Sequence, residues 1–396
     1  MESQTRSAPD ALLDPTPEPD HRRTSDDDGR GLDYPFPEIP APGEAMPVAD
    51  GILWIRMPLP WSLDHINLYL LADGDGWLIL DSGVRTPEIM SLWETHFAGS
   101  MAGRPATRIF ITHHHPDHIG LAGWLSERFD APLAMSRSAF LLARTLSLDI
   151  RDTPPGEVLR FSRRAGFSDA MIEKQKAAGW GHFARGVHRL PIGHERVADG
   201  ALIRIGGADW HAIETAGHAP GHLVLYSPER RILVSGDQVL PEISSNVSVY
   251  PTEPHGNPLR EWLDGLARLL ALPEDTLVLP SHNRPFRGLH RRLEALISKH
   301  LDRLADVLAL TESAPRTAIE IFPALFRRRV SGLEFAMATG EAIAHLHFLE
   351  ALGVLVREER DGVARFRPAA PFDAAAERRR LHALTEKERK DASWAV

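Results

Sequence analysis

The chain has 396 residues, of which 43% are hydrophobic and 25% charged, as in an ordinary water-soluble protein. A single core stops growing at roughly 250–300 residues, so this length predicts two folded parts. No apolar run approaches the roughly 20 residues that span a membrane, which argues against a membrane protein. The chain has no cysteine, which excludes disulfides and any thiolate ligand or nucleophile.

The formal net charge of −9 lies mostly at the N-terminus. Residues 1–45 hold eleven acidic and four basic side chains and are rich in Pro, Asp and Ser. This composition predicts a disordered acidic tail. The tail lacks the basic start and apolar centre of a secretory signal, which predicts a cytoplasmic protein. The rest of the chain is close to neutral, and this net charge does not indicate a nucleic-acid-binding surface.

Short apolar segments separated by Pro, Asp or Gly turns predict strands in two groups. Helical spacing of apolar residues predicts further elements between and after them. The predicted strands are 51–57, 66–73, 76–83 and 108–111 in the first group, and 201–207, 209–217, 222–228, 230–236 and 276–280 in the second. The predicted helices outside the insert described next are 87–99, 258–272 and 288–310.

The segment 136–195 separates the two groups of strands and is predicted to be a helical insert. Helical patterns occur at 138–148, 157–166 and 169–179. Residues 136–190 hold ten Lys and Arg against five acids, a local excess of positive charge. We interpret the insert as a lid that meets an anionic substrate, and the alternative is an ordinary solvated helix surface.

The segment 311–370 is predicted to be a separate winged-helix domain. Helical patterns at 317–326 and 340–352, with Thr339 as the N-cap, precede two short strands joined at Asp361-Gly362. Residues 311–367 hold eight basic and eight acidic side chains, which favours packing or homodimer formation over nucleic-acid binding. The last residues, 371–396, are predicted to be a C-terminal tail.

The stretch THHHPDHIG, residues 112–120, directly follows the strand predicted at 108–111. Loops at the carboxyl ends of strands are where α/β folds place their chemistry. His113 and His115 alternate on one side of an extended loop and can converge on one ion, whereas Asp117 and His118 turn toward a neighbouring position. The spacing H-x-H-x-D-H therefore indicates a site for two metals.

Three further segments deliver a nitrogen or oxygen ligand directly after a predicted strand. They are His218 in TAGHAPGH, Asp237 in VSGDQ and His282 in LPSHNRP. Imidazole and carboxylate ligands suit Zn²⁺, although the same set holds iron or manganese. Two Zn²⁺ ions per chain are therefore the predicted cofactors.

With Asp81 in LILDSG, these motifs resemble those of the metallo-β-lactamase superfamily, in the same order, over residues 46–310. The resemblance implies an α/β fold, an αββα sandwich of two mixed sheets with helices outside, here with a small C-terminal winged-helix domain. It implies that the first metal is held by His113, His115 and His218, the second by Asp117, His118 and His282, and that Asp237 bridges both.

Catalytic or supporting roles are expected for three residues, and of these only the role of Asp81 is implied by the resemblance. Asp117 is expected to position the attacking hydroxide as well as to bind metal. Asp81 is expected to orient a ligand without touching the metals. His222 is expected to contact the substrate or to support a ligand, and a structural role at the start of a strand is the alternative.

The implied reaction is hydrolysis by a hydroxide that two zinc ions share. The predicted substrate is an ester or thioester of a small anionic acyl compound. The alternative is a single-strand-directed endoribonuclease, since some β-lactamase-like proteins with a winged-helix domain have that activity. Glyoxalase II-type hydrolases are related, but the basic helical tail expected to grip glutathione is replaced here by the C-terminal domain.

Overall fold

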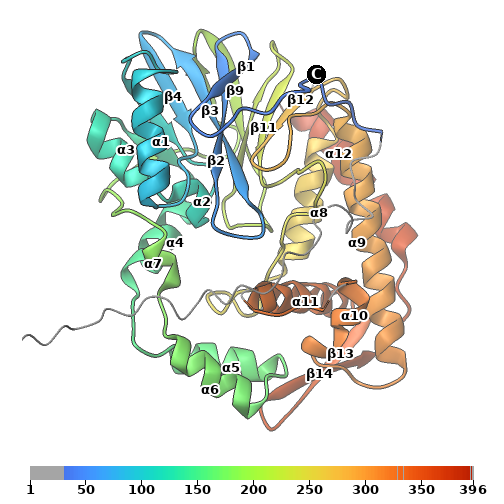
Figure 1. Ribbon diagram of the computed structural model, residues 1–396. Helices are drawn as coiled ribbons and strands as arrows, with labels where there is room; N and C mark the ends of the chain where they lie inside the picture. Colours follow the sequence, from blue (N-terminus) through green and yellow to red (C-terminus); the bar gives the residue numbers. More distant parts are fainter. Residues whose placement is uncertain (1–30, 328, 333, 393, 395–396) are drawn as a thin grey trace, which may run out of the picture.

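Two sheets face each other in the upper part of the computed structural model, which describes residues 31–327, 329–332, 334–392 and 394 (Figure 1). The first sheet contains, in spatial order, β1 (Ala45–Ala49), β2 (Ile52–Pro58), β3 (His65–Asp73), β4 (Gly76–Leu80), β5 (Ala106–Phe110), β6 (Leu133–Met135) and β7 (Glu195–Arg196). The second contains β12 (Leu277–Pro280), β11 (Ile232–Gly236), β10 (Leu223–Ser227), β9 (Ala208–Glu214) and β8 (Leu202–Ile205).

The strand directions place several carboxyl ends at one edge. In the first sheet β1 to β4 run antiparallel, and β4 to β7 run parallel. In the second sheet β11 and β12 are parallel to each other, while the other neighbours are antiparallel. The strands predicted from the sequence are confirmed within a few residues. The short strands β1, β6 and β7 were not predicted, because two to five residues carry little periodicity.

Side chains along each strand alternate between two hydrophobic cores. In β3, Leu68 and Leu70 pack toward the outer helices, while Tyr69 and Leu71 lie between the two sheets. In β10, Tyr226 packs toward the helices of the other side. This period of two is the pattern of a sheet that is buried on both faces. The expected αββα sandwich is therefore confirmed.

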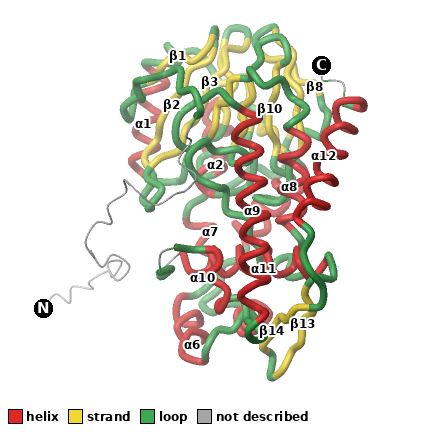
Figure 2. Tube along the Cα trace, turned by 90° about the vertical axis from the view of Figure 1, so that its right-hand side faces the viewer, coloured by secondary structure: helices red, strands yellow, loops and turns green. Residues whose placement is uncertain are grey.

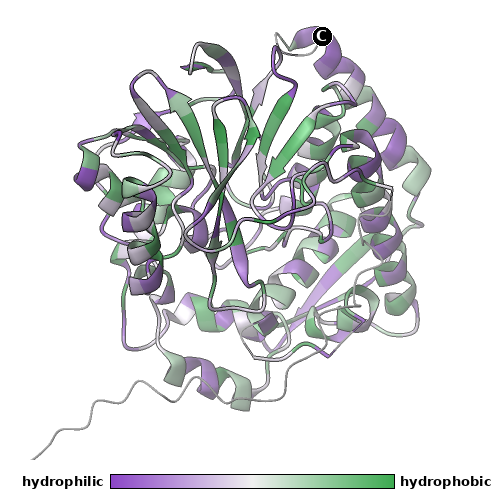
Figure 3. Cartoon of the chain, turned by 45° about the horizontal axis from the view of Figure 1, so that its top comes forward, coloured by the Kyte–Doolittle hydropathy of each residue, from purple (hydrophilic) through white to green (hydrophobic). Residues whose placement is uncertain are grey.

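Helices cover the outer face of each sheet (Figure 2). Figure 3 shows hydrophobic strands at the centre and hydrophilic outer faces on several of these helices. The helices beside the first sheet are α1 (Pro87–Ala98), α2 (Pro116–Ile119) and α3 (Ala122–Phe129). Those beside the second sheet are α8 (Pro258–Leu269), α9 (Leu289–Glu312) and α12 (Ala374–Asp391).

The predicted insert forms four helices below the first sheet (Figure 1). They are α4 (Arg137–Leu148), α5 (Gly156–Arg164), α6 (Asp169–Ala178) and α7 (His182–Arg185). Arg164 of α5 pairs with Glu359 of the C-terminal part at 2.7 Å, so the insert contacts both halves of the molecule. Its function as a lid stays a prediction.

The C-terminal part contains helices followed by a hairpin, as expected. Its elements are η1 (Ile319–Ile321), α10 (Phe322–Leu325), α11 (Glu334–Ala351), β13 (Leu355–Arg360) and β14 (Val363–Pro368). The start predicted for the second helix is wrong. Thr339 lies inside α11, where its hydroxyl donates to the Phe335 carbonyl at 2.7 Å instead of capping the helix. The assignment as a winged-helix domain stays a prediction.

The predicted C-terminal tail is wrong for most of its length, because these residues form α12. Leu381 is buried, and the charges of α12 pair with arginines of α8. Arg260 lies 3.1 Å from Glu377, and Arg268 lies 2.8 Å from Glu388. The many charges that suggest an exposed tail therefore serve to dock this helix.

The predicted N-terminal tail falls mostly outside the described residues, because 1–30 are not described. The prediction that it extends to residue 45 is wrong. Asp33 exchanges two main-chain hydrogen bonds with Arg287, at 3.2 and 2.8 Å. The guanidinium of Arg284 lies 4.3 Å from the centre of the Tyr34 ring. Residues from 31 onward thus lie against the body.

Candidate metal centre

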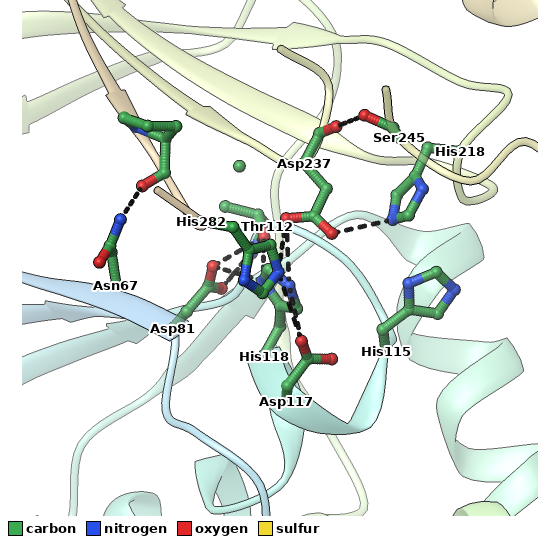
Figure 4. Close-up of polar contacts among 12 residues, drawn as sticks. Asn67, Asp81, Thr112, His115, Asp117, His118, His218, Asp237, Ser245 and His282 are labelled. Carbon is green, nitrogen blue, oxygen red and sulfur yellow. Dashed lines mark hydrogen bonds and ion pairs between the residues drawn. The ribbon is translucent and has the colours of Figure 1, made fainter. Parts of the chain in front are cut away.

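The residues predicted to bind metal meet at one edge of the two sheets (Figure 4). The chain leaves β5 toward His113, leaves β11 at Asp237 and leaves β12 toward His282. His218 lies on the loop that joins β9 and β10. Because the two sheets face each other, loops from both converge, and all seven predicted ligands lie in two adjoining groups.

The first group consists of His113, His115, His218 and Asp237. His113 Nε2 lies 3.0 Å from His115 Nδ1 and 3.2 Å from His218 Nε2. His218 Nε2 lies 3.3 Å from Asp237 Oδ2. Ligand atoms about 2.0–2.1 Å from a tetrahedral ion are about 3.3 Å apart from one another. These four atoms therefore have the spacing of ligands to one ion.

The second group consists of Asp117, His118 and His282. Asp117 Oδ2 lies 3.7 Å from His118 Nε2 and 3.5 Å from His282 Nε2. Asp237 Oδ1 lies 3.4 Å from each of these two nitrogens. Asp237 thus turns one oxygen toward each group, which is the arrangement of a bridging carboxylate.

Two buried atoms indicate that this space suits a cation. His118 Nε2 and Asp237 Oδ1 are buried and have no hydrogen-bond partner among the described residues. Leaving a buried polar atom unsatisfied costs about 1–3 kcal/mol. A metal ion between them would satisfy both atoms, so the residues present fit the predicted ions.

Besides His113, whose Nδ1 lies 3.0 Å from the Thr112 hydroxyl, three of the predicted ligand histidines are oriented by a contact at their other ring nitrogen. Such a contact fixes the tautomer, so that the lone pair of the inner nitrogen faces the metal position. The contacts are His118 Nδ1 to Asp81 Oδ2 (2.8 Å), His218 Nδ1 to the Asn246 carbonyl (2.7 Å) and His282 Nδ1 to the His65 carbonyl (2.8 Å).

Asp81 lies behind His118, where the resemblance implied. Its carboxylate is fully buried and also accepts hydrogen bonds from the Thr112 main-chain N–H at 2.8 Å and the Thr112 hydroxyl at 2.9 Å. Its φ of +59° is in the left-handed region, which Asp adopts more readily than most residues. This backbone turn, directly after β4, aims the carboxylate at the histidine loop.

His222 lies behind Asp237 and is fully buried. Its Nε2 accepts the main-chain N–H of Asp237 at 3.2 Å, and its Nδ1 lies 3.1 Å from the Thr215 hydroxyl. A Cβ at Gly236 would lie 2.6 Å from His222 Nε2, so this close approach requires glycine. The geometry favours the supporting role over the catalytic role expected for His222.

Charges in the cluster set the protonation of its members. Burial lowers the pKa of His113 and His115 well below the usual value, and neighbouring imidazoles add to this effect. Burial would also lower the pKa of His118, but the carboxylates of Asp237, Asp81 and Asp117 raise it well above the usual value. Burial raises the pKa of Asp237, yet His282 and His118 outweigh it and hold that pKa well below normal.

A cavity of about 200 Å³ opens beside the first group, with His115 and His218 in its wall. The insert forms one side of it through apolar side chains. The apolar residues of the wall are Leu142, Leu146, Trp180, Phe183, Pro220, Val249, Tyr250, Pro251 and Pro258. Glu253 and Glu261 are the acids in the lining, and no Lys or Arg occurs among its described residues.

The basic residues of the insert lie in a different groove. Arg160, Arg163 and Arg164 line it together with Pro251 and Glu359. Arg163 pairs with Asp169, and Arg164 with Glu359, each at 2.7 Å. These charges therefore do not line the cavity beside the metal centre, and their contact with an anionic part of the substrate stays a prediction.

Sequence reasoning did not identify three supporting residues. Thr112 lies 3.0 Å from His113 Nδ1, and its position next to the histidine run is a signal that could have indicated it. The hydroxyl of Ser245 donates to the Asp237 carbonyl, and Asn246 supports His218. Neither Ser245 nor Asn246 belongs to a motif, so no local signal marks them.

The sandwich and its cluster of His and Asp are features of a metal-dependent hydrolase. Residues 61–282 match the Metallo-beta-lactamase superfamily, and residues 304–369 match the family described as Metallo-beta-lactamase-like, C-terminal domain. The chain belongs to the metallo-β-lactamase superfamily.

Similar proteins extend over most of the chain. The crystal structure of a Beta-lactamase domain protein from Burkholderia ambifaria is 39% identical, with a TM-score of 0.80, and the match covers 86% of this chain and 99% of that one. The probable metallo-hydrolase YqjP of Bacillus subtilis is 26% identical over 327 residues, which cover 76% of this chain and 93% of YqjP. The human acyl-coenzyme A thioesterase MBLAC2 is 25% identical over 266 residues, which cover 65% of this chain and 86% of MBLAC2.

Proposed function

We propose that the protein is a binuclear metallohydrolase that cleaves esters or thioesters of small apolar acyl groups. One observation carries this proposal: the Asp237 carboxylate lies between two groups of metal ligands beside an apolar cavity. The hydrolase class follows from the family, whereas the number of metals and the substrate are our inference.

In this proposal seven side chains hold two Zn²⁺ ions, and iron or manganese fits the same ligands. When bound, the ions lower the pKa of water toward about 7 and polarise the scissile carbonyl. His113, His115 and His218 would hold one ion, Asp117, His118 and His282 would hold the other, and Asp237 would serve both.

Asp117 is the residue that we propose for proton transfer. Its side chain is 13% exposed, against 0% for His118 and 2% for His282. It can therefore reach a water oxygen at the open side of the site. The water oxygen bonds to the acyl carbon, the C–S or C–O bond breaks, and Asp117 carries the proton from the water to the departing sulfur or oxygen.

The acyl group is proposed to lie in the cavity beside His115 and His218. A water molecule occupies about 30 Å³ of liquid, and a methylene group is of similar size, so about 200 Å³ accommodates roughly six or seven groups. Each buried methylene contributes about 0.8 kcal/mol. This favours acyl chains of about six to eight carbons over acetyl, and the thioesterase activity in the name of MBLAC2 supports thioester chemistry.

The anionic character expected of the substrate is proposed to belong to the leaving group. The groove with Arg160, Arg163 and Arg164 shares Pro251 with the wall of the acyl cavity, so the two spaces adjoin. A phosphate-bearing thiol such as coenzyme A has its charges far from the thioester. The apolar acyl end of such a substrate would then lie in the cavity beside His115 and His218, and its phosphates would lie in the groove with the three arginines.

The endoribonuclease alternative has no specific observation in its favour. Basic side chains of the hairpin pair with nearby acids: Arg357 with Glu350 (3.3 Å), Arg365 with Glu320 (3.0 Å) and Arg367 with Glu358 (2.7 Å). An arginine that is already paired with an acid gains little from replacing a counterion on an RNA phosphate.

Among the described residues, no helix is long and apolar enough to cross a membrane.

A hydrolysis panel on metal-quantified protein tests this proposal. The substrates are acetyl-, hexanoyl- and palmitoyl-coenzyme A, lactoyl-glutathione, a lactone, a β-lactam and single-stranded RNA. We expect hexanoyl-coenzyme A to give the highest kcat/KM, and Asp117→Asn to lower kcat with little effect on KM. Cleavage of RNA without turnover of any thioester would refute the proposal.

A further inference from the structure

The segment 238–250, between β11 and α8, backs two residues of the first group, Asp237 and His218, without forming a helix or strand. Ser245 donates its hydroxyl proton to the carbonyl of Asp237. The main-chain carbonyl of Asn246 accepts a hydrogen bond from His218 Nδ1–H at 2.7 Å. Irregular backbone has no repeating hydrogen bonds of its own, so other parts of the molecule must fix its position.

Helix α11 of the C-terminal part supplies some of these contacts, and α9 supplies others: Arg292 donates to the carbonyls of Leu240 and Ile243, and His300 Nε2 lies 2.9 Å from the Ser244 hydroxyl. The main-chain N–H of Val249 donates to the Gly340 carbonyl at 3.1 Å. The side-chain amide of Asn246 donates to Glu341 Oε2 at 3.3 Å. One main-chain bond and two side-chain bonds thus join the ligand-supporting segment to α11, the third being from the Ser248 hydroxyl to the Met337 carbonyl at 3.0 Å.

The helix and the segment are in close contact at this point. A Cβ added to Gly340 would lie 2.7 Å from Ser248 Cβ and 2.9 Å from the Val249 carbonyl oxygen, so any other residue would push the two apart. Next to it, Glu341 is only 8% exposed, and its second oxygen lies 3.2 Å from the Arg303 guanidinium of α9. Arg303 therefore holds the carboxylate in place while its other oxygen accepts from Asn246.

We propose that Glu341 is a positioning residue of the metal centre. Glu341 holds the side-chain amide of Asn246. The main-chain carbonyl of Asn246 in turn accepts from His218 Nδ1 and so fixes the tautomer and direction of the His218 ring. This inference rests on the proposed function in one respect, namely that His218 binds metal. The C-terminal part then completes the metal centre and is more than a packing or dimerisation unit.

Metal affinity tests this inference separately from catalysis. The affinity is measured by chelator competition, together with the absorption spectrum of the Co²⁺-loaded protein. Loss of a contact behind a ligand lowers metal affinity about 10–100-fold, so we expect Glu341→Ala to weaken one of the two metal positions at least tenfold and to change the Co²⁺ spectrum. Glu341→Gln keeps an oxygen that can accept from Asn246, so it should retain most of the affinity.

Two further variants separate positioning from general stability. Asn246→Ala should weaken the same position, and the double variant with Glu341→Ala should be no weaker than the weaker single variant, because both remove one link. Glu350→Ala is the matched control, since Glu350 lies on the same helix and pairs with Arg357 at 3.3 Å, away from the ligand-supporting segment. Its metal affinity should equal that of the unmodified protein.

Several results would overturn the inference. Wild-type affinity and spectrum in Glu341→Ala would do so, as would an equal loss in Glu350→Ala or additive losses in the double variant. If Glu341→Ala does not fold, Glu341→Gln and Asn246→Ala decide by the same criteria. Two metals bound with equal affinity in the unmodified protein and in Glu341→Ala would reject this inference alone, whereas no metal in the unmodified protein would reject the proposed function as well.

Discussion

Replacing Asp81 with Asn would test how the second metal position is oriented. The carboxylate accepts hydrogen bonds from the Thr112 N–H, the Thr112 hydroxyl and His118 Nδ1. An Asn keeps one acceptor oxygen for Thr112 but turns an NH₂ group toward His118. The ring must then leave a buried donor unsatisfied or switch tautomer and lose its inward lone pair. We expect a cost of about 1–3 kcal/mol, seen as a roughly 10–100-fold lower affinity for one metal.

The assay is a titration of metal-free protein against a chelator of known affinity, with the melting temperature recorded for each sample. Asp73→Asn is the matched control, because Asp73 also accepts from a threonine hydroxyl (Thr107, 2.9 Å) and a main-chain N–H (Gly206, 3.2 Å) but contacts no ligand histidine. If Asp81→Asn binds two metals as tightly as the control, the orienting role of Asp81 is refuted.

Three further predictions follow from the cavity, the groove and a buried histidine. Leu146→Trp fills the acyl cavity and should raise KM for hexanoyl thioesters while leaving acetyl thioesters nearly unchanged; equal effects on both would show that the acyl group lies elsewhere. Neutralising Arg160, Arg163 and Arg164 together should raise KM for an acyl-coenzyme A and leave kcat on a neutral ester unchanged; no change in KM would remove the groove from substrate binding. Burial lowers the pKa of His345 to about 3, so the unfolded chain binds a proton that the folded chain does not, and stability should fall as pH drops from 6.5 toward 3. His345→Gln should therefore show a shallower acid loss in urea unfolding, by an amount on the order of a few kcal/mol, and an unchanged slope would contradict this.

The residues that meet in the candidate metal centre could be predicted because each lies in a segment that follows a strand. His113, Asp237 and His282 follow β5, β11 and β12 in the sequence, so local patterns identify both the strand and the ligand. The nearly continuous apolar runs of β3 and β10 are likewise typical of strands that are buried on both faces. These features depend on short-range periodicity, which one sequence reveals.

Features that depend on distant contacts were missed. Asn246 and Glu341 are 95 residues apart, and neither belongs to a recognisable motif. The charged sequence of α12 predicts a tail, because its partners Arg260 and Arg268 lie on another helix more than a hundred residues earlier. The position of the insert arginines away from the metal cavity could not be inferred either, because a count of basic and acidic residues does not show where their side chains lie in the fold.

The central claim is that one carboxylate, Asp237, joins two metal positions. Elemental analysis of purified protein, unmodified and with Asp237→Ala, tests this most directly, since Asp237 has an oxygen 3.3–3.4 Å from ligand nitrogens of both groups. We predict close to two equivalents of transition metal in the unmodified protein and loss of most of it in the variant. Two equivalents retained in Asp237→Ala, or none in the unmodified protein, would contradict the account.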